Sequence, residues 1–71
     1  MKKYLVIFEK TAAGYSAYVP DLPGCVATGI TKKETEKNIF EAIEFHLEGL
    51  ALEGAAIPVP IAEAEVLVFQ A

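Results

Sequence analysis

The chain has no arginine or tryptophan, and only one cysteine and one histidine among its 71 residues. A single cysteine excludes an intrachain disulfide. Arginine is the side chain best suited to phosphate and guanine contacts. Its absence, together with a net charge of −4, argues against direct binding of DNA or RNA. One histidine and one cysteine also make a poor metal ligand set, so we expect no metal and no cofactor.

Long hydrophobic runs are missing as well. The first apolar run, Tyr4 to Phe8, is too short for a signal peptide, and no stretch approaches transmembrane length. We therefore expect a cytoplasmic protein. The 54% hydrophobic content excludes disorder, yet so short a chain buries only about 60% of its unfolded surface. We predict one domain, residues 1–71, that forms a homo-oligomer, either a dimer or a tetramer.

The pattern of the chain predicts three strands, a long helix and a last strand. A capping-box pattern, Thr31 to Glu34, begins a helix expected from about Lys32 to about Leu52. The expected strands are Tyr4–Phe8, Tyr15–Val19, Cys25–Thr28 and, after the helix, Ala64–Phe69. The order β-β-β-α-β gives an α+β fold: a small mixed sheet with one helix packed on one face.

The expected helix has two different faces. At about 100° per residue, an apolar stripe faces the sheet. Its members are Ile39, Ala42, Ile43, His46, Leu47 and Leu50, with Phe40 at the edge. The opposite face carries Glu41, Glu44 and Glu48, with Phe45 beside them. These carboxylates are either an ordinary solvated face or a surface that attracts a cationic partner, and Phe45 is either an interface anchor or packs under the final loop.

A proline-marked corner follows the second strand. Pro20 and Pro23 fix the backbone, and Gly24 allows unusual angles. Between the prolines, Asp21 either contacts a basic partner or accepts a hydrogen bond from the backbone of its own turn. Cys25 fits a small buried apolar residue.

The corner Tyr18–Cys25 also carries a resemblance. The run Tyr-Val-Pro-Asp-Leu-Pro-Gly-Cys follows a Gly-Tyr-x-Ala step at Gly14 and precedes the Thr-x-x-Glu helix start at Thr31. This combination resembles the HicB-like antitoxin family over nearly the whole chain. One position departs from the family, because Ile30 stands where many members have an acidic residue. Many members also carry a DNA-binding segment after this domain; here the chain ends at Ala71, so DNA binding is not expected.

The resemblance implies a function and a partner. It implies a truncated ribonuclease-H-like fold and a non-enzymatic inhibitor whose partner is a HicA-type toxin, a small basic protein that cleaves RNA. The residues predicted to bind that partner are Asp21, Glu41, Glu44, Phe45 and Glu48. An orphan homo-oligomeric domain with a structural or ligand-binding role stays open as an alternative. A metal-dependent nuclease needs converging carboxylates, and the expected strands offer only Glu9 and Glu65.

Overall fold

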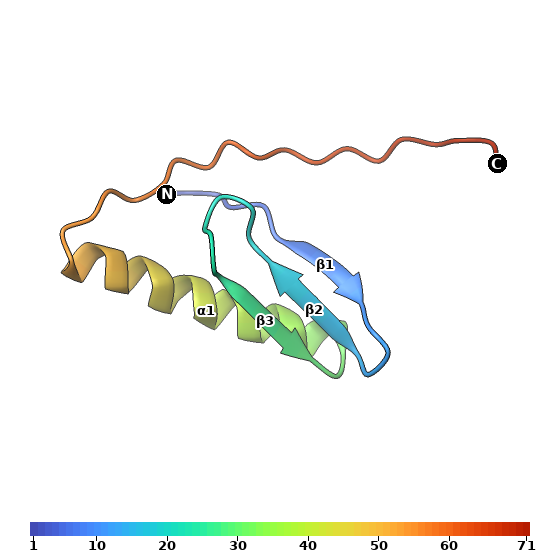
Figure 1. Ribbon diagram of the computed structural model, residues 1–71, viewed down its shortest axis with the longest axis horizontal. Coiled ribbons are helices and arrows are strands. Elements are labelled where there is room, and N and C mark those ends of the chain that lie inside the picture. Colours follow the sequence, from blue (N-terminus) through green and yellow to red (C-terminus); the bar gives the residue numbers. More distant parts are fainter.

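The computed structural model describes all 71 residues and shows three strands followed by one helix. The elements are β1 (Ile7–Lys10), β2 (Tyr15–Tyr18), β3 (Val26–Gly29) and α1 (Lys32–Leu52). The strands form one antiparallel sheet in the order β1-β2-β3 (Figure 1). The α+β fold class predicted from the sequence is confirmed, and the helix has the predicted bounds.

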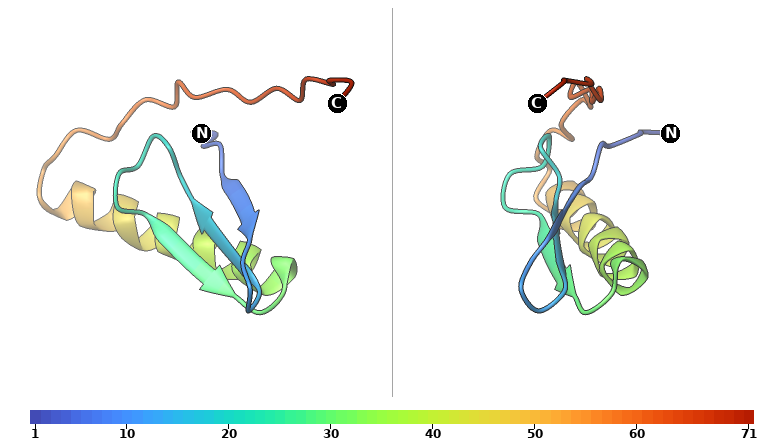
Figure 2. Two further views of the ribbon diagram at one scale, coloured as in Figure 1. Left: turned by 45° about the vertical axis from the view of Figure 1, so that its right-hand side comes forward. Right: turned by 90° about the vertical axis from the view of Figure 1, so that its right-hand side faces the viewer.

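The helix covers only one face of this sheet (Figure 2). Phe8 and Ala27 lie in register with Ala17 on the covered face. Ile7, Tyr18 and Val26 form the neighbouring cross-strand row, and successive strand residues point to opposite faces. The second row therefore lies on the open face, where Val26 is exposed.

The start of α1 confirms the predicted capping box. The Thr31 hydroxyl accepts a hydrogen bond from the Glu34 N–H at 3.1 Å. The Glu34 carboxylate accepts from the Ile30 N–H at 2.9 Å, one residue earlier than in the usual box. Two N–H groups at the helix entry thus find acceptors, which sets the first helical residue.

The core lies between the covered sheet face, the corner and α1. Its buried apolar members are Ala17, Val19, Leu22, Cys25 and Ile39. The predicted apolar stripe of the helix is confirmed, because every residue assigned to it is buried or half-buried. Phe40, placed at its edge, is exposed.

The prediction that Ala64–Phe69 adds a strand to the sheet is wrong for the single chain. This segment is extended but lies away from the sheet, which has three strands (Figure 1). The radius of gyration is accordingly 13.9 Å, against about 11 Å for a compact domain of this length. The β-branched composition favoured an extended backbone, but pairing depends on the direction in which the preceding loop leaves the helix.

The end of β3 and the first turn of α1 approach each other so closely that the strand needs a residue without a side chain there. A Cβ atom on Gly29 would lie 2.5 Å from the Thr35 hydroxyl oxygen and 2.8 Å from the Thr35 backbone nitrogen. Thr35 is fully buried, and its hydroxyl donates to the Thr31 carbonyl at 2.8 Å. Gly29 therefore lets the first turn of the helix approach the sheet.

We expect Gly29→Ala to lower the free energy of unfolding by about 1–3 kcal/mol, because the helix start must move to admit the methyl group. Gly49→Ala is the matched control. Gly49 lies within α1 with nothing within 4 Å of its added Cβ, so alanine there should raise stability by up to about 1 kcal/mol. Urea denaturation of both variants measures this. Equal stability of Gly29→Ala and the wild type would contradict the close approach.

Candidate functional site

Four of the five residues predicted to bind a partner lie together on α1. Glu41, Glu44, Phe45 and Glu48 are spaced so that they share one side of the helix, and all four are exposed. We call these four residues the acidic strip. The Phe45 side chain is 80% exposed, so it does not pack under the final loop. The helix thus presents three carboxylates and one aromatic ring on a rigid support.

The fifth residue, Asp21, lies apart from the acidic strip. Its Oδ2 atom accepts hydrogen bonds from the backbone N–H groups of Ile61 at 3.1 Å and Ala62 at 3.0 Å. The expected alternatives for Asp21 were its own turn or a basic partner; the structure shows a contact with the segment after the helix. No local pattern around Asp21 could have revealed these donors.

The corner that carries Asp21 is held by backbone hydrogen bonds. The Leu22 N–H donates to the Val19 carbonyl and the Cys25 N–H to the Leu22 carbonyl, both at 3.0 Å. The Val19 N–H donates to the Cys25 carbonyl at 3.2 Å, which closes the loop. Gly24 has a φ of 83°, a conformation that other residues rarely adopt. The Asp21 carboxylate therefore stands on a well-defined turn.

The positions of Cys25 and His46 in the fold indicate packing roles for both side chains. Cys25 is buried in the core, and burial raises the pKa of its thiol, which opposes formation of a reactive thiolate. His46 is half-buried on the sheet-facing stripe of α1. No group of three or more histidine, cysteine, aspartate or glutamate side chains is placed to hold a metal ion.

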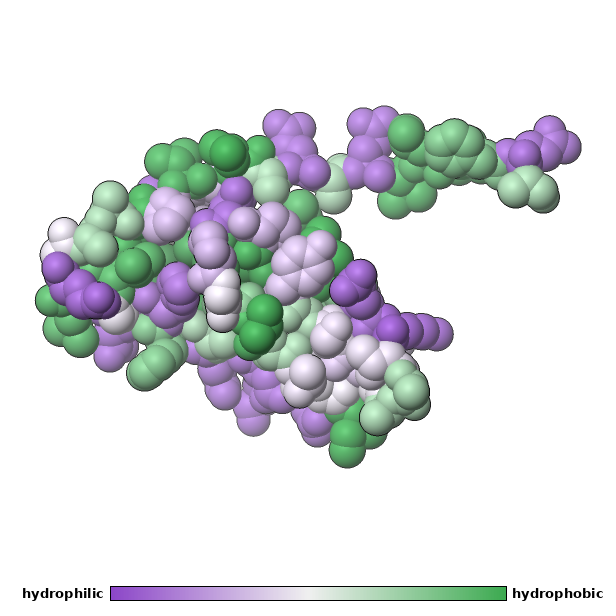
Figure 3. Space-filling view, viewed as in Figure 1, coloured by the Kyte–Doolittle hydropathy of each residue, from purple (hydrophilic) through white to green (hydrophobic).

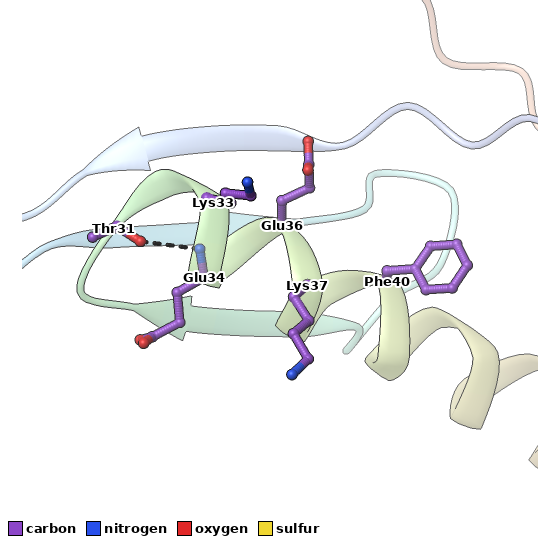
Figure 4. Close-up of a pocket in the computed structure, with 6 residues that line it drawn as sticks. All are labelled: Thr31, Lys33, Glu34, Glu36, Lys37 and Phe40. Atoms are coloured by element: carbon purple, nitrogen blue, oxygen red, sulfur yellow. Dashed lines mark hydrogen bonds between the residues drawn. The ribbon is translucent and has the colours of Figure 1, made fainter.

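Three hollows lie around the start of the helix, and two of them concern the outer side of α1 and the β1 edge. The first is lined by Thr31, Lys33, Glu34, Glu36, Lys37 and Phe40. Figure 4 shows that these side chains point in different directions and do not converge on a common centre, so this hollow has the features of a solvated surface. We call the second the β1 hollow. Its lining is almost entirely apolar: Tyr4, Leu5, Val6, Phe8, Ile39, Phe40 and Ile43, with Glu36 as the one charged member.

The helix α1 does not combine the length and the apolar character that are needed to cross a lipid bilayer. The only helix of this chain, α1, carries charged side chains along its outer side. Its apolar side chains are used instead against the sheet.

We expect Asp21→Ala to release the segment after the helix, because the N–H groups of Ile61 and Ala62 lose their acceptor. Hydrogen exchange at these two amides should become fast, and stability should fall by about 1–2 kcal/mol. Tyr4→Phe is the matched control, since it removes the other hydrogen bond to this segment, from the Tyr4 hydroxyl to the Pro58 carbonyl. It should leave protection at Ile61 and Ala62 intact. Unchanged exchange in Asp21→Ala would contradict the assigned contact.

Burial of Cys25 should make folding stability depend on alkaline pH. Its raised pKa means that the unfolded chain loses the thiol proton first, at about its ordinary value of 9.0. The contribution of the thiol is thus fully present below pH 9 and is lost as the pH rises above it. Urea denaturation of the wild type and Cys25→Ala between pH 7 and pH 10 isolates this effect. A constant stability difference between the two across that range would contradict it.

Comparison with known proteins gives a consistent result. A family model described as the HicB-like antitoxin of bacterial toxin–antitoxin systems matches residues 4–69. A UPF0150 protein of Thermoplasma acidophilum is 47% identical over 57 residues, which cover 79% of this chain and 83% of that protein. An uncharacterized 14.9 kDa protein of Haemophilus phage HP1 is 42% identical over 55 residues. This match covers 78% of the chain but 41% of the phage protein, so the chain spans less than half of that relative.

A solved structure shares both the fold and the sequence. A chain of the HicA3 and HicB3 toxin–antitoxin complex matches with a TM-score of 0.72 and 37% identity. The match covers 84% of this chain and 70% of the other. With the family model matched from the first strand almost to the last residue, the chain belongs to the HicB-like antitoxin family.

Proposed function

We propose that this protein is an antitoxin that neutralises a small, basic, RNA-cleaving toxin of the HicA type by binding over the active surface of the toxin. Its membership of the HicB-like antitoxin family carries this proposal. The likeness to a chain of the HicA3 and HicB3 complex supports the same kind of partner. In this function the chain acts by binding, as a protein that inhibits an enzyme and is not one itself.

The charge of the chain fits such a partner. A toxin that holds RNA must present a cationic surface to the phosphates, whereas this chain has a net charge of −4. Glu41, Glu44 and Glu48 extend this negative charge along one side of a helix. Because the helix fixes their spacing, little backbone entropy is lost on binding. Complementary charge also raises the rate at which the two proteins meet.

Phe45 supplies the apolar contact that charges alone lack. Its ring is 80% exposed, and exposed carboxylates lie on the same side of the helix. An aromatic residue surrounded by polar neighbours is the usual composition of an interface anchor. Asp21 belongs to the proposed contact as a subsidiary acceptor. Its hydrogen bonds to the backbone use Oδ2, so Oδ1 is left for a cationic group of the toxin.

Binding kinetics against the HicA-type toxin that this proposal expects a neighbouring gene to encode test the proposed surface. In Glu41→Gln/Glu44→Gln/Glu48→Gln, the association rate at low salt should fall about tenfold and depend less on salt. Phe45→Ala should instead raise the dissociation rate at least about tenfold, because an interface anchor is lost.

Val26→Ala is the matched control for this experiment. Val26 is an exposed apolar residue on the open face of the sheet, so the variant should bind like the wild type. If Val26→Ala loses affinity while both helix variants keep it, the toxin docks on the open sheet face. If the wild-type chain does not bind at all, the antitoxin function itself is wrong.

The chain alone should neither cleave RNA nor bind a DNA duplex, since it is acidic and has no arginine. Nuclease assays with magnesium or manganese and mobility-shift assays at low salt measure this. Saturable binding to duplex DNA below micromolar concentration would contradict the expectation. It would indicate that assembly of several copies gathers the lysines into a cationic surface.

A further inference from the structure

The segment Glu63–Phe69, which we call the arm, exposes an unusual run of apolar side chains. Val66 and Val68 are 91% and 93% exposed, and Leu67 and Phe69 are largely exposed too. The space-filling view shows the apolar part of the arm standing clear of the body (Figure 3). Valine and phenylalanine favour strands, and a continuous apolar run of this kind needs a surface that covers it.

The direction of the arm is set at its base. Asp21 holds the backbone of Ile61 and Ala62, and the Tyr4 hydroxyl holds the carbonyl of Pro58. Pro58 and Pro60 also fix their φ angles. The base therefore lies against the body while the arm extends beyond it (Figure 1). The arm is an extended segment on a fixed support, already shaped for strand pairing.

The sheet has two outer edges, β1 and β3, and the β1 edge is the less obstructed. At the β3 edge, the Thr28 carbonyl accepts a hydrogen bond from the Asn38 side chain of α1 at 2.8 Å. At the β1 edge, by contrast, no side chain hydrogen-bonds to the backbone of Ile7–Lys10. An uncovered edge presents unpaired N–H and C=O groups to another strand. β1 is therefore the edge that an incoming strand would meet.

The surroundings of β1 fit the side chains of the arm. The β1 hollow has a volume of about 300 Å³ and lies between the start of the chain and α1. Its lining is apolar apart from Glu36, so side chains of valine, leucine or phenylalanine suit it. A strand on the β1 edge would place every second side chain over this covered face of the sheet.

We propose that two copies of this chain exchange their arms, so that each arm forms a strand parallel to β1 of the other copy. The segment Lys2–Phe8 has the same length as the arm. In the parallel direction the charges also match: Glu63 and Glu65 at the start of the arm meet Lys2 and Lys3 before β1. Val66 to Phe69 then lie along Leu5 to Phe8, the apolar run that leads into β1.

A second copy suits the arm better than its own β1 edge. Both arrangements make the same contacts between arm and edge, as in other domain-swapped proteins. They differ only in the base of the arm, and here Asp21 and the two prolines hold the base so that the arm points away from its own sheet. In a two-fold dimer both arms and both hollows are used at once, because the interface is the same on each copy. This assembly does not depend on the proposed toxin.

Light scattering after size exclusion tests the exchange on the full chain at micromolar concentration. The wild type should have about twice the monomer mass of 7.7 kDa. Val66→Pro/Leu67→Pro should reduce the mass to that of the monomer. Neighbouring strand residues direct their N–H groups to opposite sides, so one of the two prolines removes a donor facing β1. Phe45→Asp, which changes an equally exposed residue on α1, should remain a dimer.

Three results would overturn the exchange. The first is a wild-type chain with the mass of a monomer. Slow hydrogen exchange in the arm of such a monomer would show that the arm folds onto its own β1. Fast exchange would show that the arm is free or is covered only when a toxin binds. A dimer that survives the proline variant is another. A dimer lost in Phe45→Asp but kept in the proline variant would place the interface on the helix.

Charge exchange tests the parallel direction. Lys2→Glu/Lys3→Glu and Glu63→Lys/Glu65→Lys should each weaken the dimer by about tenfold at low salt, because attraction becomes repulsion. The chain carrying all four changes should regain the wild-type affinity. If the losses of dimer affinity in the two double variants add up in the fourfold variant, the arm does not run parallel to β1.

Discussion

The burial of Leu22 in the corner between β2 and β3 is the contact on which the rest of the structure depends. Its side chain is fully buried against the core, which stabilises the fold by about 1.5–3 kcal/mol. Backbone hydrogen bonds with Val19 and Cys25 fix the same residue from both sides. Because Leu22 cannot leave the core without opening the corner, its neighbour Asp21 has a fixed position. Asp21 in turn holds the segment after the helix.

The local features of the fold were predictable from the sequence because neighbouring residues determine them. Thr31 and Glu34 satisfy N–H groups within one helical turn, so their spacing alone predicted the helix start. The division of α1 into a sheet-facing stripe and an outer acidic strip follows from the helical repeat. For the same reason, Glu41, Glu44, Phe45 and Glu48 could be placed together before the structure was known.

The features that were not predictable depend on residues far apart in the chain. Asp21 and Ala62 are separated by 41 positions, and nothing near either residue indicates their hydrogen bond. Thr35 lies among charged residues in the sequence, yet it is fully buried because Gly29 admits the helix so closely. The expected last strand had the right composition, but its pairing depends on where the corner holds the base of the arm.

The fold thus separates two surfaces on one small domain. The outer side of α1 carries rigid negative charge, whereas the free β1 edge and the arm carry apolar surface suited to a second copy. The two proposed uses involve residues on different elements, so we expect toxin binding and arm exchange to be compatible.

The most direct test of the proposed antitoxin function is the RNA-cleaving activity of the HicA-type toxin expected from a neighbouring gene, titrated with this chain. The proposed function predicts that cleavage falls in proportion to the added chain and stops when the two proteins are equimolar. Unchanged cleavage in the presence of excess folded chain would contradict it.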